Sequence, residues 1–358
     1  MQTAIPYMQF RGGSSKGLFF KATDLPADEV LRNKIILAAM EGVGSGDPRQ
    51  IDGLGGATSL TSKVAIVSLS KSENTDLDYL FLQVVVGKGK ISTTQTCGNI
   101  LAAVLPFAIE SGMLKANEKT TSAKIKMMNT GGICEVTVQT PNGKVEYAGT
   151  AKVDGVPGTA AEIICNYLET EGSTCGTLLP TGNIIDIVDG IEITCIDNGM
   201  PEVILRATDL GITGNETPTE LDANEVLKQK LESIRLQIGP KMNLGDIKEK
   251  TIPKMCIISA PVNGGAINTR TFIPHVCHEA IGVLGAVSTA TACMLKGSVM
   301  DEIAVVSDKN KLSVEHPTGE FTVQLDITNM NGTIIINKAG VIRTARLLSK
   351  GEVYIPEL

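Results

Sequence analysis

Short runs rich in valine and isoleucine alternate along the chain with turns rich in glycine and proline. These runs predict strands over residues 64–69, 80–86, 134–139, 191–196 and 256–260. Amphipathic stretches at 27–40 and 223–237 predict helices. Strands and helices are mixed without a regular alternation, which favours an α+β fold over a doubly wound sheet.

Two further predicted helices are apolar on nearly every face. Residues 98–112 read GNILAAVLPFAIESG, and residues 278–297 read HEAIGVLGAVSTATACMLKG. A helix that is hydrophobic all round must be buried. One such helix in each half predicts two domains built alike, each with a curled sheet around a buried helix. We place the domains at 1–178 and 179–358, and leave open a return of the last strand, about 340–358, to the first domain.

Composition narrows the range of functions. The 358 residues include 39 acidic and 32 basic side chains, no tryptophan and 3% aromatic residues, which argues against a nucleic-acid partner. No uninterrupted apolar run reaches the roughly 18 residues of a membrane span. Residues 1–11 lack the basic and apolar regions of a secretory signal. We therefore expect a cytoplasmic protein without a membrane partner.

The cysteines and histidines show no metal-binding spacing. None of the eight cysteines forms a CxxC pair, and the chain has three histidines. We therefore expect neither disulfides nor a bound metal. The default interpretation of each cysteine is a small buried hydrophobic residue.

Two positions stand out as candidates for proton transfer. Cys97-Gly98-Asn99 lies where the first buried helix begins, and the unpaired N–H groups and dipole of a helix start favour an anion. Cys97 is therefore a candidate proton donor or acceptor, with capping or packing as the alternative. At residues 53–67 a glycine-rich turn leads Lys63 into an apolar run. A buried lysine favours the neutral amine, a usable general base, whereas an exposed edge strand is the alternative.

Other polar segments interrupt the apolar runs. RGGSSKG at 11–17 is either an anion-binding turn that uses Arg11 and backbone N–H groups or a plain hairpin turn. In the second half, Asn198 and Arg270 lie at polar breaks beside predicted strands. His278 lies at the predicted start of the second buried helix, where it either contacts substrate or caps the helix. The spacing of these residues leaves each pair of alternatives open.

Motifs along essentially the whole chain resemble the 2-methylaconitate isomerase (PrpF-like) family, which also includes 3-methylitaconate isomerase and 4-oxalomesaconate tautomerase. The matching segments are RGGSSKG at 11–17, IDGLGGATSLTSKVAIVS at 51–68, TCGN at 96–99, VDGVPGT at 153–159, LPTGN at 179–183 and CIDNGMP at 195–201. Segments at 232–246, 269–275 and 351–356 resemble the 4-oxalomesaconate branch in particular.

The resemblance implies a diaminopimelate epimerase-like fold of two pseudo-symmetric domains with the active site between them. The epimerases use one cysteine from each domain. In this chain Cys97 matches the first catalytic cysteine, whereas the position of the second aligns with Ile281, close to Cys277. The resemblance implies that Lys63, on the LTSK motif, takes the place of the second cysteine. The family chemistry is a cofactor-independent 1,3-allylic proton shift in an unsaturated di- or tricarboxylate. Lys63 would remove the proton and Cys97 would return it.

The resemblance favours 4-oxalomesaconate, an intermediate in the breakdown of aromatic acids, over 2-methylaconitate or 3-methylitaconate. We expect the substrate carboxylates and the developing charge to be held by Arg11, Ser14, Ser15, Ser62, Gly98, Asn99, Asn198, Arg270 and His278. A homodimer is plausible for such an enzyme. The alternatives are a two-base racemase or epimerase and a catalytically silent carboxylate-binding protein.

Overall fold

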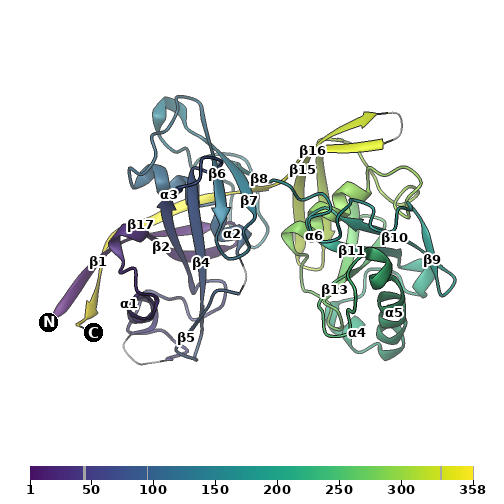
Figure 1. Cartoon of the computed structure of the whole chain (residues 1–358), viewed down its shortest axis with the longest axis horizontal. Helices are drawn as coiled ribbons and strands as arrows, with labels where there is room; N and C mark the ends of the chain where they lie inside the picture. Colours follow the sequence, from purple (N-terminus) through teal and green to yellow (C-terminus); the bar gives the residue numbers. More distant parts are fainter. Residues whose placement is uncertain (43–45, 95, 331–332, 358) are drawn as a thin grey trace. The chain divides into compact units, whose positions relative to one another are not determined.

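The computed structural model describes residues 1–42, 46–94, 96–330 and 333–357, and the chain divides into two compact units (Figure 1). Unit 1 comprises Met1–Asn166 and Ile342–Leu358, and unit 2 comprises Tyr167–Val341. The division falls before the boundary expected at 178. Backbone N–H groups of Thr174 and Cys175 donate to Asp197 Oδ2 at 2.8 and 2.7 Å, which ties this segment to unit 2.

Unit 1 is built on a mixed sheet. Its strands are β1 (Gln2–Gly12), β2 (Ser15–Lys21), β3 (Lys63–Leu69), β4 (Leu77–Val85), β5 (Lys90–Ser92), β6 (Thr120–Met127), β7 (Ile133–Gln139), most of β8 (Ile163–Tyr167) and β17 (Ala345–Pro356). Its helices are α1 (Glu29–Glu41), α2 (Gly98–Leu101) and α3 (Val104–Glu110). The last strand, β17, pairs with β1 along its length, which accounts for the place of residues 342–358 in unit 1.

Unit 2 contains the remaining long strands and helices. Its strands are β9 (Asp186–Val188), β10 (Ile191–Asp197), β11 (Pro201–Arg206), β12 (Lys254–Ser259), β13 (Ile267–Phe272), β14 (Lys311–His316), β15 (Gly319–Met330) and most of β16 (Thr333–Arg343). Its α-helices are α4 (Pro218–Asp222), α5 (Glu225–Ile238) and α6 (Val283–Ala292).

The two units repeat one order of strand pairing. In unit 1, β1–β2, β3–β4 and β6–β7 are antiparallel, whereas β2–β3 and β4–β6 are parallel. In unit 2, β10–β11, β12–β13 and β14–β15 are antiparallel, whereas β11–β12 and β13–β14 are parallel. Helices α2–α3 and α6 occupy equivalent places in this order. The repeat confirms the prediction of an α+β fold with two similar mixed sheets and buried central helices.

The alternation of side chains along the strands gives the sheet of unit 1 two buried faces. Val64 and Ile66 of β3 belong to the core that contains α1 residues Ile36 and Met40. On the opposite face, the rings of Phe10, Phe19 and Phe107 pack together with centroids 5.1 to 6.4 Å apart, which brings α3 against β1 and β2. Lys63 has the parity of Ala65 and therefore lies on the α2–α3 face.

The predicted strands correspond to β3, β4, β7, β10 and β12, and the amphipathic helices to α1 and α5. The two apolar helices are shorter than expected. Residues 98–112 form α2 and α3 with a break at 102–103, because Pro106 has no N–H for the carbonyl of Ala102 and its ring would clash with that carbonyl. Residues 278–297 contain only α6, which begins at Val283.

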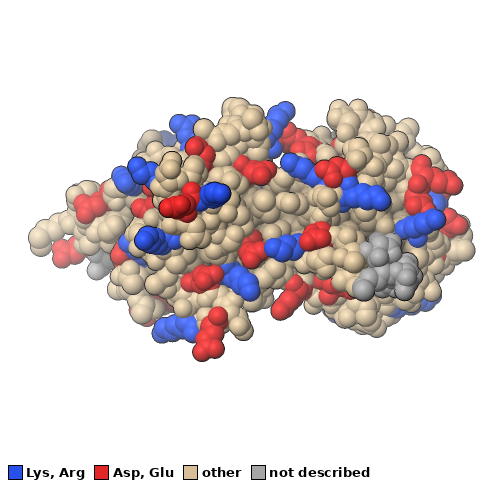
Figure 2. Space-filling model, turned by 90° about the horizontal axis from the view of Figure 1, so that it is seen from above, with Lys and Arg blue, Asp and Glu red and all other residues tan. Residues whose placement is uncertain are grey.

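Charged side chains of both signs are interspersed on the face of the molecule that Figure 2 presents. The face shown therefore has no broad basic surface of the kind that binds nucleic acid. The chain as a whole carries a net charge of −7 at neutral pH. Among the residues that the structure describes, no helix is long and apolar enough to cross a membrane.

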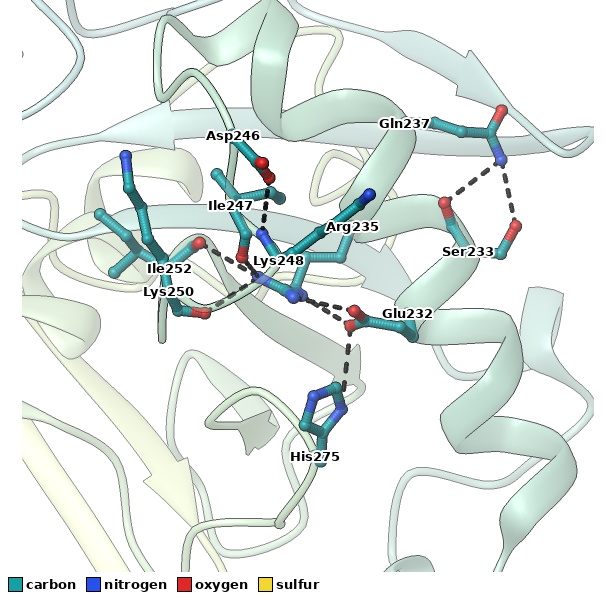
Figure 3. Close-up of polar contacts among 10 residues, drawn as sticks. All are labelled: Glu232, Ser233, Arg235, Gln237, Asp246, Ile247, Lys248, Lys250, Ile252 and His275. Carbon is teal, nitrogen blue, oxygen red and sulfur yellow. Dashed lines mark hydrogen bonds and ion pairs between the residues drawn. The ribbon is translucent and has the colours of Figure 1, made fainter.

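A buried arginine holds the loop that leads into β12 (Figure 3). The side chain of Arg235 in α5 is 0% exposed, and its Nε and Nη2 donate to the Glu232 carboxylate at 2.7 and 2.8 Å. Its Nη1 donates at 3.1 to 3.2 Å to the carbonyl oxygens of Ile247, Lys250 and Ile252. The guanidinium thereby supplies donors to carbonyl oxygens of this irregular loop, beyond the bond from Lys250 N to the Ile247 carbonyl that the loop makes itself.

We expect Arg235→Lys to lower the free energy of unfolding by about 3 kcal/mol, because an ammonium cannot reproduce the planar array of donors and leaves buried carbonyls unpaired. Arg206→Lys is the matched control, since Arg206 is 23% exposed and pairs with Glu192 and Asp209 at the surface. Its loss should stay below about 1 kcal/mol. Urea denaturation followed by circular dichroism measures both, and equal losses would contradict the structural role of Arg235.

Candidate active site

Lys63 is a buried lysine in the interior of the unit 1 sheet. It is the first residue of β3, is 7% exposed, and pairs with Gly17 on β2 and with Gln83 on β4. The alternative of an exposed edge strand is therefore wrong. A Cβ on Gly17 would lie 2.5 Å from the carbonyl oxygen of Lys63, so glycine at this position permits the close approach of β2 and β3.

The Lys63 amine meets an amide and an aromatic ring. Its Nζ donates to Gln83 Oε1 at 2.8 Å and lies 5.2 Å from the centroid of the Phe81 ring. Within the described ranges, no carboxylate forms an ion pair with this amine.

Cys97 lies at the other end of the same face of β4. It is the N-cap residue of α2, its side chain is partly exposed, and its carbonyl oxygen accepts a hydrogen bond from Tyr79 Oη at 3.2 Å. Tyr79, Phe81 and Gln83 alternate along β4 and so share one face. This face contacts the backbone carbonyl of Cys97 and the side-chain amine of Lys63, the two residues proposed from the sequence for proton transfer.

The glycine-rich turn at 11–17 packs against the start of α2. A Cβ on Gly12 would lie 2.3 Å from the carbonyl oxygen of Asn99, and one on Gly13 would lie 2.1 Å from Asn99 Oδ1. Asn99 Nδ2 also donates to Ser14 Oγ at 3.2 Å. The buried hydroxyl of Ser15 has no hydrogen-bond partner in the described part of the chain. Two motifs far apart in sequence thus form one polar region.

Two further candidates in unit 1 hold loops in place. Arg11 Nη1 donates to the carbonyl oxygens of Gly13 and Thr344 and to Thr344 Oγ1 at 2.9 to 3.0 Å. Burial and the neighbouring Arg346 lower the pKa of Arg11. Ser62 Oγ donates to Gln50 Oε1 at 2.7 Å. These contacts hold two glycine-rich segments in place: the turn at 11–17 and the loop at 50–62 that leads into Lys63.

In unit 2, Asn198 and Arg270 are engaged in internal contacts. Asn198 is 0% exposed, donates from Nδ2 to Thr291 Oγ1 at 2.8 Å, and accepts from Thr170 Oγ1 at 2.6 Å. Arg270 Nε donates to the carbonyl oxygen of Glu216 at 2.6 Å. The structure does not bring these two side chains into contact with each other.

The prediction that His278 begins the second buried helix is wrong. Its N–H donates to the carbonyl oxygen of Thr271 at 2.8 Å, so the chain still follows the end of β13 at this point. The helix starts after the N-cap residue Gly282. His278 Nδ1 accepts from the N–H of Ala280 at 2.8 Å, and burial, together with Lys254, lowers the pKa of His278.

The residues near the expected second catalytic position are apolar or strongly buried. Ile281 is 2% exposed and Cys277 is 3% exposed. Burial, with a contribution from the Asp222 carboxylate, raises the pKa of Cys277 to about 12. A thiolate is therefore disfavoured at Cys277, which weakens the two-cysteine alternative.

Glu202, a buried carboxyl group on β11, lies in no motif that marks it in the sequence. It is 0% exposed, its Oε2 accepts from Thr289 Oγ1 at 2.8 Å, and its Oε1 has no partner among the described residues. A Cβ on Gly285 would lie 2.7 Å from Oε1, which explains a glycine inside α6. Burial raises the pKa of Glu202 to about 8 against the opposing effects of Thr289 and Lys254.

All eight cysteines are free thiols. Over the described ranges of the chain, no group of three or more histidine, cysteine, aspartate or glutamate side chains is arranged to hold a metal ion.

A mixed sheet around a buried helix, repeated once along the chain, defines an α+β protein whose fold is shared with epimerases and isomerases. The fold matches a hydroxyproline epimerase from Agrobacterium vitis with a TM-score of 0.52 and 13% identity, over 99% of this chain and 93% of that chain. It matches methylitaconate-delta-isomerase with a TM-score of 0.87 and 33% identity, over 99% and 96% of the two chains.

The chain belongs to the PrpF family: residues 2–356 match this family, which is described as "PrpF protein". It is 53% identical to 4-oxalomesaconate tautomerase from Pseudomonas putida, over 99% of this chain and 97% of that protein. It is 52% identical to (4E)-oxalomesaconate Delta-isomerase from a Novosphingobium species, over 98% and 97%. These relationships confirm the family and the isomerase class expected from the sequence motifs.

The buried Glu202 makes stability depend on pH. Its pKa in the folded protein, about 8, lies above the ordinary value of 4.5, so the folded state retains a proton that the unfolded chain releases. This effect should lower the free energy of unfolding by about 1.4 kcal/mol per pH unit as the pH rises between these values.

Glu202→Gln keeps an acceptor for Thr289 without an ionisable group, so its stability relative to the wild type should increase as the pH rises through this interval. Urea denaturation at a series of pH values measures the difference. Exposed Glu249 provides the control Glu249→Gln, which should run parallel to the wild type. Parallel curves for Glu202→Gln as well would show that the buried carboxyl is not the source of the dependence.

Proposed function

We propose that this isomerase of the PrpF family catalyses a 1,3-allylic proton shift in an unsaturated tricarboxylate, and that 4-oxalomesaconate is its substrate. The observation that carries the proposal is the shared face of β4, which contacts buried Lys63 at one end and Cys97 at the other. The identities of the two oxalomesaconate relatives support the choice of substrate.

In the proposed reaction, Lys63 acts as a neutral amine and removes a proton from the carbon allylic to the double bond. The negative charge then spreads into an enolate-like system conjugated with a carboxylate or oxo group. Cys97 donates a proton at the other end of the allyl unit, and the double bond moves. The substrate loses one proton and gains one, so the reaction needs neither a redox partner nor a cofactor. Turnover leaves Lys63 as the ammonium and Cys97 as the thiolate, and proton exchange with solvent returns both groups to their starting states before the next cycle.

The developing charge requires hydrogen-bond donors in fixed positions. The first helical hydrogen bond of α2 runs from Leu101 N to the carbonyl oxygen of Cys97, which leaves the N–H groups of Gly98 and Asn99 outside the helical ladder. We propose that these N–H groups and the hydroxyls of Ser14 and Ser15 donate hydrogen bonds to the developing negative charge and to the substrate carboxylates. A preorganised donor of this kind contributes about 10²–10³ in rate.

The other candidates have supporting or separate roles in this proposal. Arg11 and Ser62 order the loops of unit 1, Asn198 and Arg270 order unit 2, and His278 remains a candidate carboxylate contact. The proposal also includes a homodimer located in the cytoplasm that binds neither nucleic acid nor a membrane. Light scattering of the purified protein tests the dimer.

Proton NMR of the purified enzyme with 4-oxalomesaconate in D₂O tests the reaction. We expect the double bond to migrate at a catalytic rate, with deuterium entering at the carbon that gains a proton. Deuterium exchange without migration would redirect the substrate to 2-methylaconitate or 3-methylitaconate. The absence of both signals would contradict the proposed chemistry.

Substitution of the two proton-transfer residues tests their roles. Lys63→Met should lower kcat by about 10³-fold or more, because methionine fills the site without a basic group. Cys97→Ser should lower kcat by at least about tenfold, because a hydroxyl is a much weaker acid than a thiol. Cys293→Ser, at another partly exposed cysteine, is the control and should retain normal turnover. Normal rates in either active-site variant would remove that residue from the mechanism.

A further inference from the structure

The side chain of Gln83 is engaged at both ends of its amide. It lies opposite Lys63 in the antiparallel pairing of β3 and β4. Its Oε1 accepts the hydrogen bond from Lys63 Nζ at 2.8 Å. Its Nε2 donates at 3.0 to 3.1 Å to the carbonyl oxygens of Ser59, Ser62 and Val84. The amide therefore connects the lysine to the loop that precedes β3.

The three carbonyl oxygens fix the orientation of this amide. Rotating the amide by half a turn would place Oε1 against three other acceptors and would place the Nε2 donors against Lys63 Nζ. Only the observed orientation gives each donor an acceptor. The backbone around Gln83 thus forces a carbonyl oxygen toward the lysine.

This arrangement restricts the geometry at the lysine nitrogen. A neutral amine has two hydrogens and one lone pair. One hydrogen of Lys63 Nζ is directed to Gln83 Oε1, and the face of the Phe81 ring, 5.2 Å from Nζ to the centroid, covers a second direction. The lone pair is left to the remaining direction, which is what a base requires for a substrate proton.

We propose that Gln83 is the positioning residue for Lys63: its carbonyl oxygen fixes the direction of the amine without placing a charge beside it. The inference rests on the proposed role of Lys63 as the base. Gln83 acts through Lys63 and makes no contact with substrate in this proposal. Its contribution should therefore appear in kcat and in the pH dependence, and much less in KM.

The second unit offers an internal comparison. Lys254 is the first residue of β12, as Lys63 is of β3, and the parallel register places it beside Glu202 on β11. At the equivalent pairing in unit 1, Lys63 lies beside Gly17. The same place in the repeated fold therefore has a carboxyl neighbour in one unit and a glycine in the other. The unit with the proposed base is the one whose lysine has an uncharged neighbour and an amide acceptor.

Two substitutions of Gln83 separate the effects of charge and position. Gln83→Glu places a negative charge next to Nζ and favours the ammonium, so the acidic limb of the kcat/KM profile should move to higher pH by at least about one unit. The loss near neutral pH should be about tenfold and should recover as the pH rises. Gln83→Met removes the acceptor without adding charge. It should lower kcat by about 10- to 100-fold without an alkaline shift of the limb.

The profiles are measured by steady-state kinetics over about pH 5.5 to 9.5, with circular dichroism to verify folding. Gln139→Glu, at a partly buried glutamine that ends β7, is the matched control and should keep the wild-type limb. An unshifted limb in Gln83→Glu overturns the inference. If that variant does not fold, Gln83→Met decides: unchanged kcat overturns the inference, and a lower kcat with KM within about threefold supports it.

Lys63→Met separates this inference from the proposed function. An active Lys63→Met enzyme would end the role of Lys63 and the inference with it. If Lys63→Met is inactive but the acidic limb of the Gln83→Glu profile does not shift, the proposed role of Lys63 as the base stands and only the role of Gln83 is rejected.

Discussion

A lysine inside a sheet needs a polar partner for its amine, and this constraint shapes the face of unit 1 that carries Lys63. Strand β3 is covered on both edges, so Lys63 is largely buried, unlike a lysine on an edge strand. The alternation of side chains sends Val64 to the α1 core and Lys63 to the face of α2 and α3. The partners of the Lys63 amine therefore come from β4, which provides the amide of Gln83 and the ring of Phe81.

Much of the fold follows from local patterns in the sequence. Strands β3 and β12 are short apolar runs bounded by turns, and α5 has a clear apolar stripe, so each could be recognised from a few neighbouring residues. The ends of the buried helices could not. An apolar helix offers no change of pattern at its boundary, and the start of α6 depends on His278 pairing with Thr271 of β13, a contact that hydrophobicity does not encode.

The candidate site was only partly predictable for a related reason. Lys63 and Cys97 stand out because each places a reactive side chain at the start of an apolar segment. The contact between Ser14 and Asn99 joins residues 85 positions apart, and spacing cannot show that they meet. The roles of Gln83 and Glu202 also could not be predicted from the sequence, since a single polar residue in a strand normally indicates an exposed face. Here both are enclosed by partners from other strands and helices.

The repeated fold also shows how asymmetric chemistry can arise in a symmetric framework. In the proposed reaction a proton leaves one carbon and another arrives at a different carbon, and both proposed proton carriers, Lys63 and Cys97, belong to unit 1. The two units share their strand order and place a lysine at the start of β3 and of β12. They differ in the neighbours of that lysine and in the residues that precede the central helix, Cys97 in unit 1 and Ile281 near the start of α6. Under the proposed function, these few neighbours give only unit 1 the residues for proton transfer, while both units keep the same order of strand pairing.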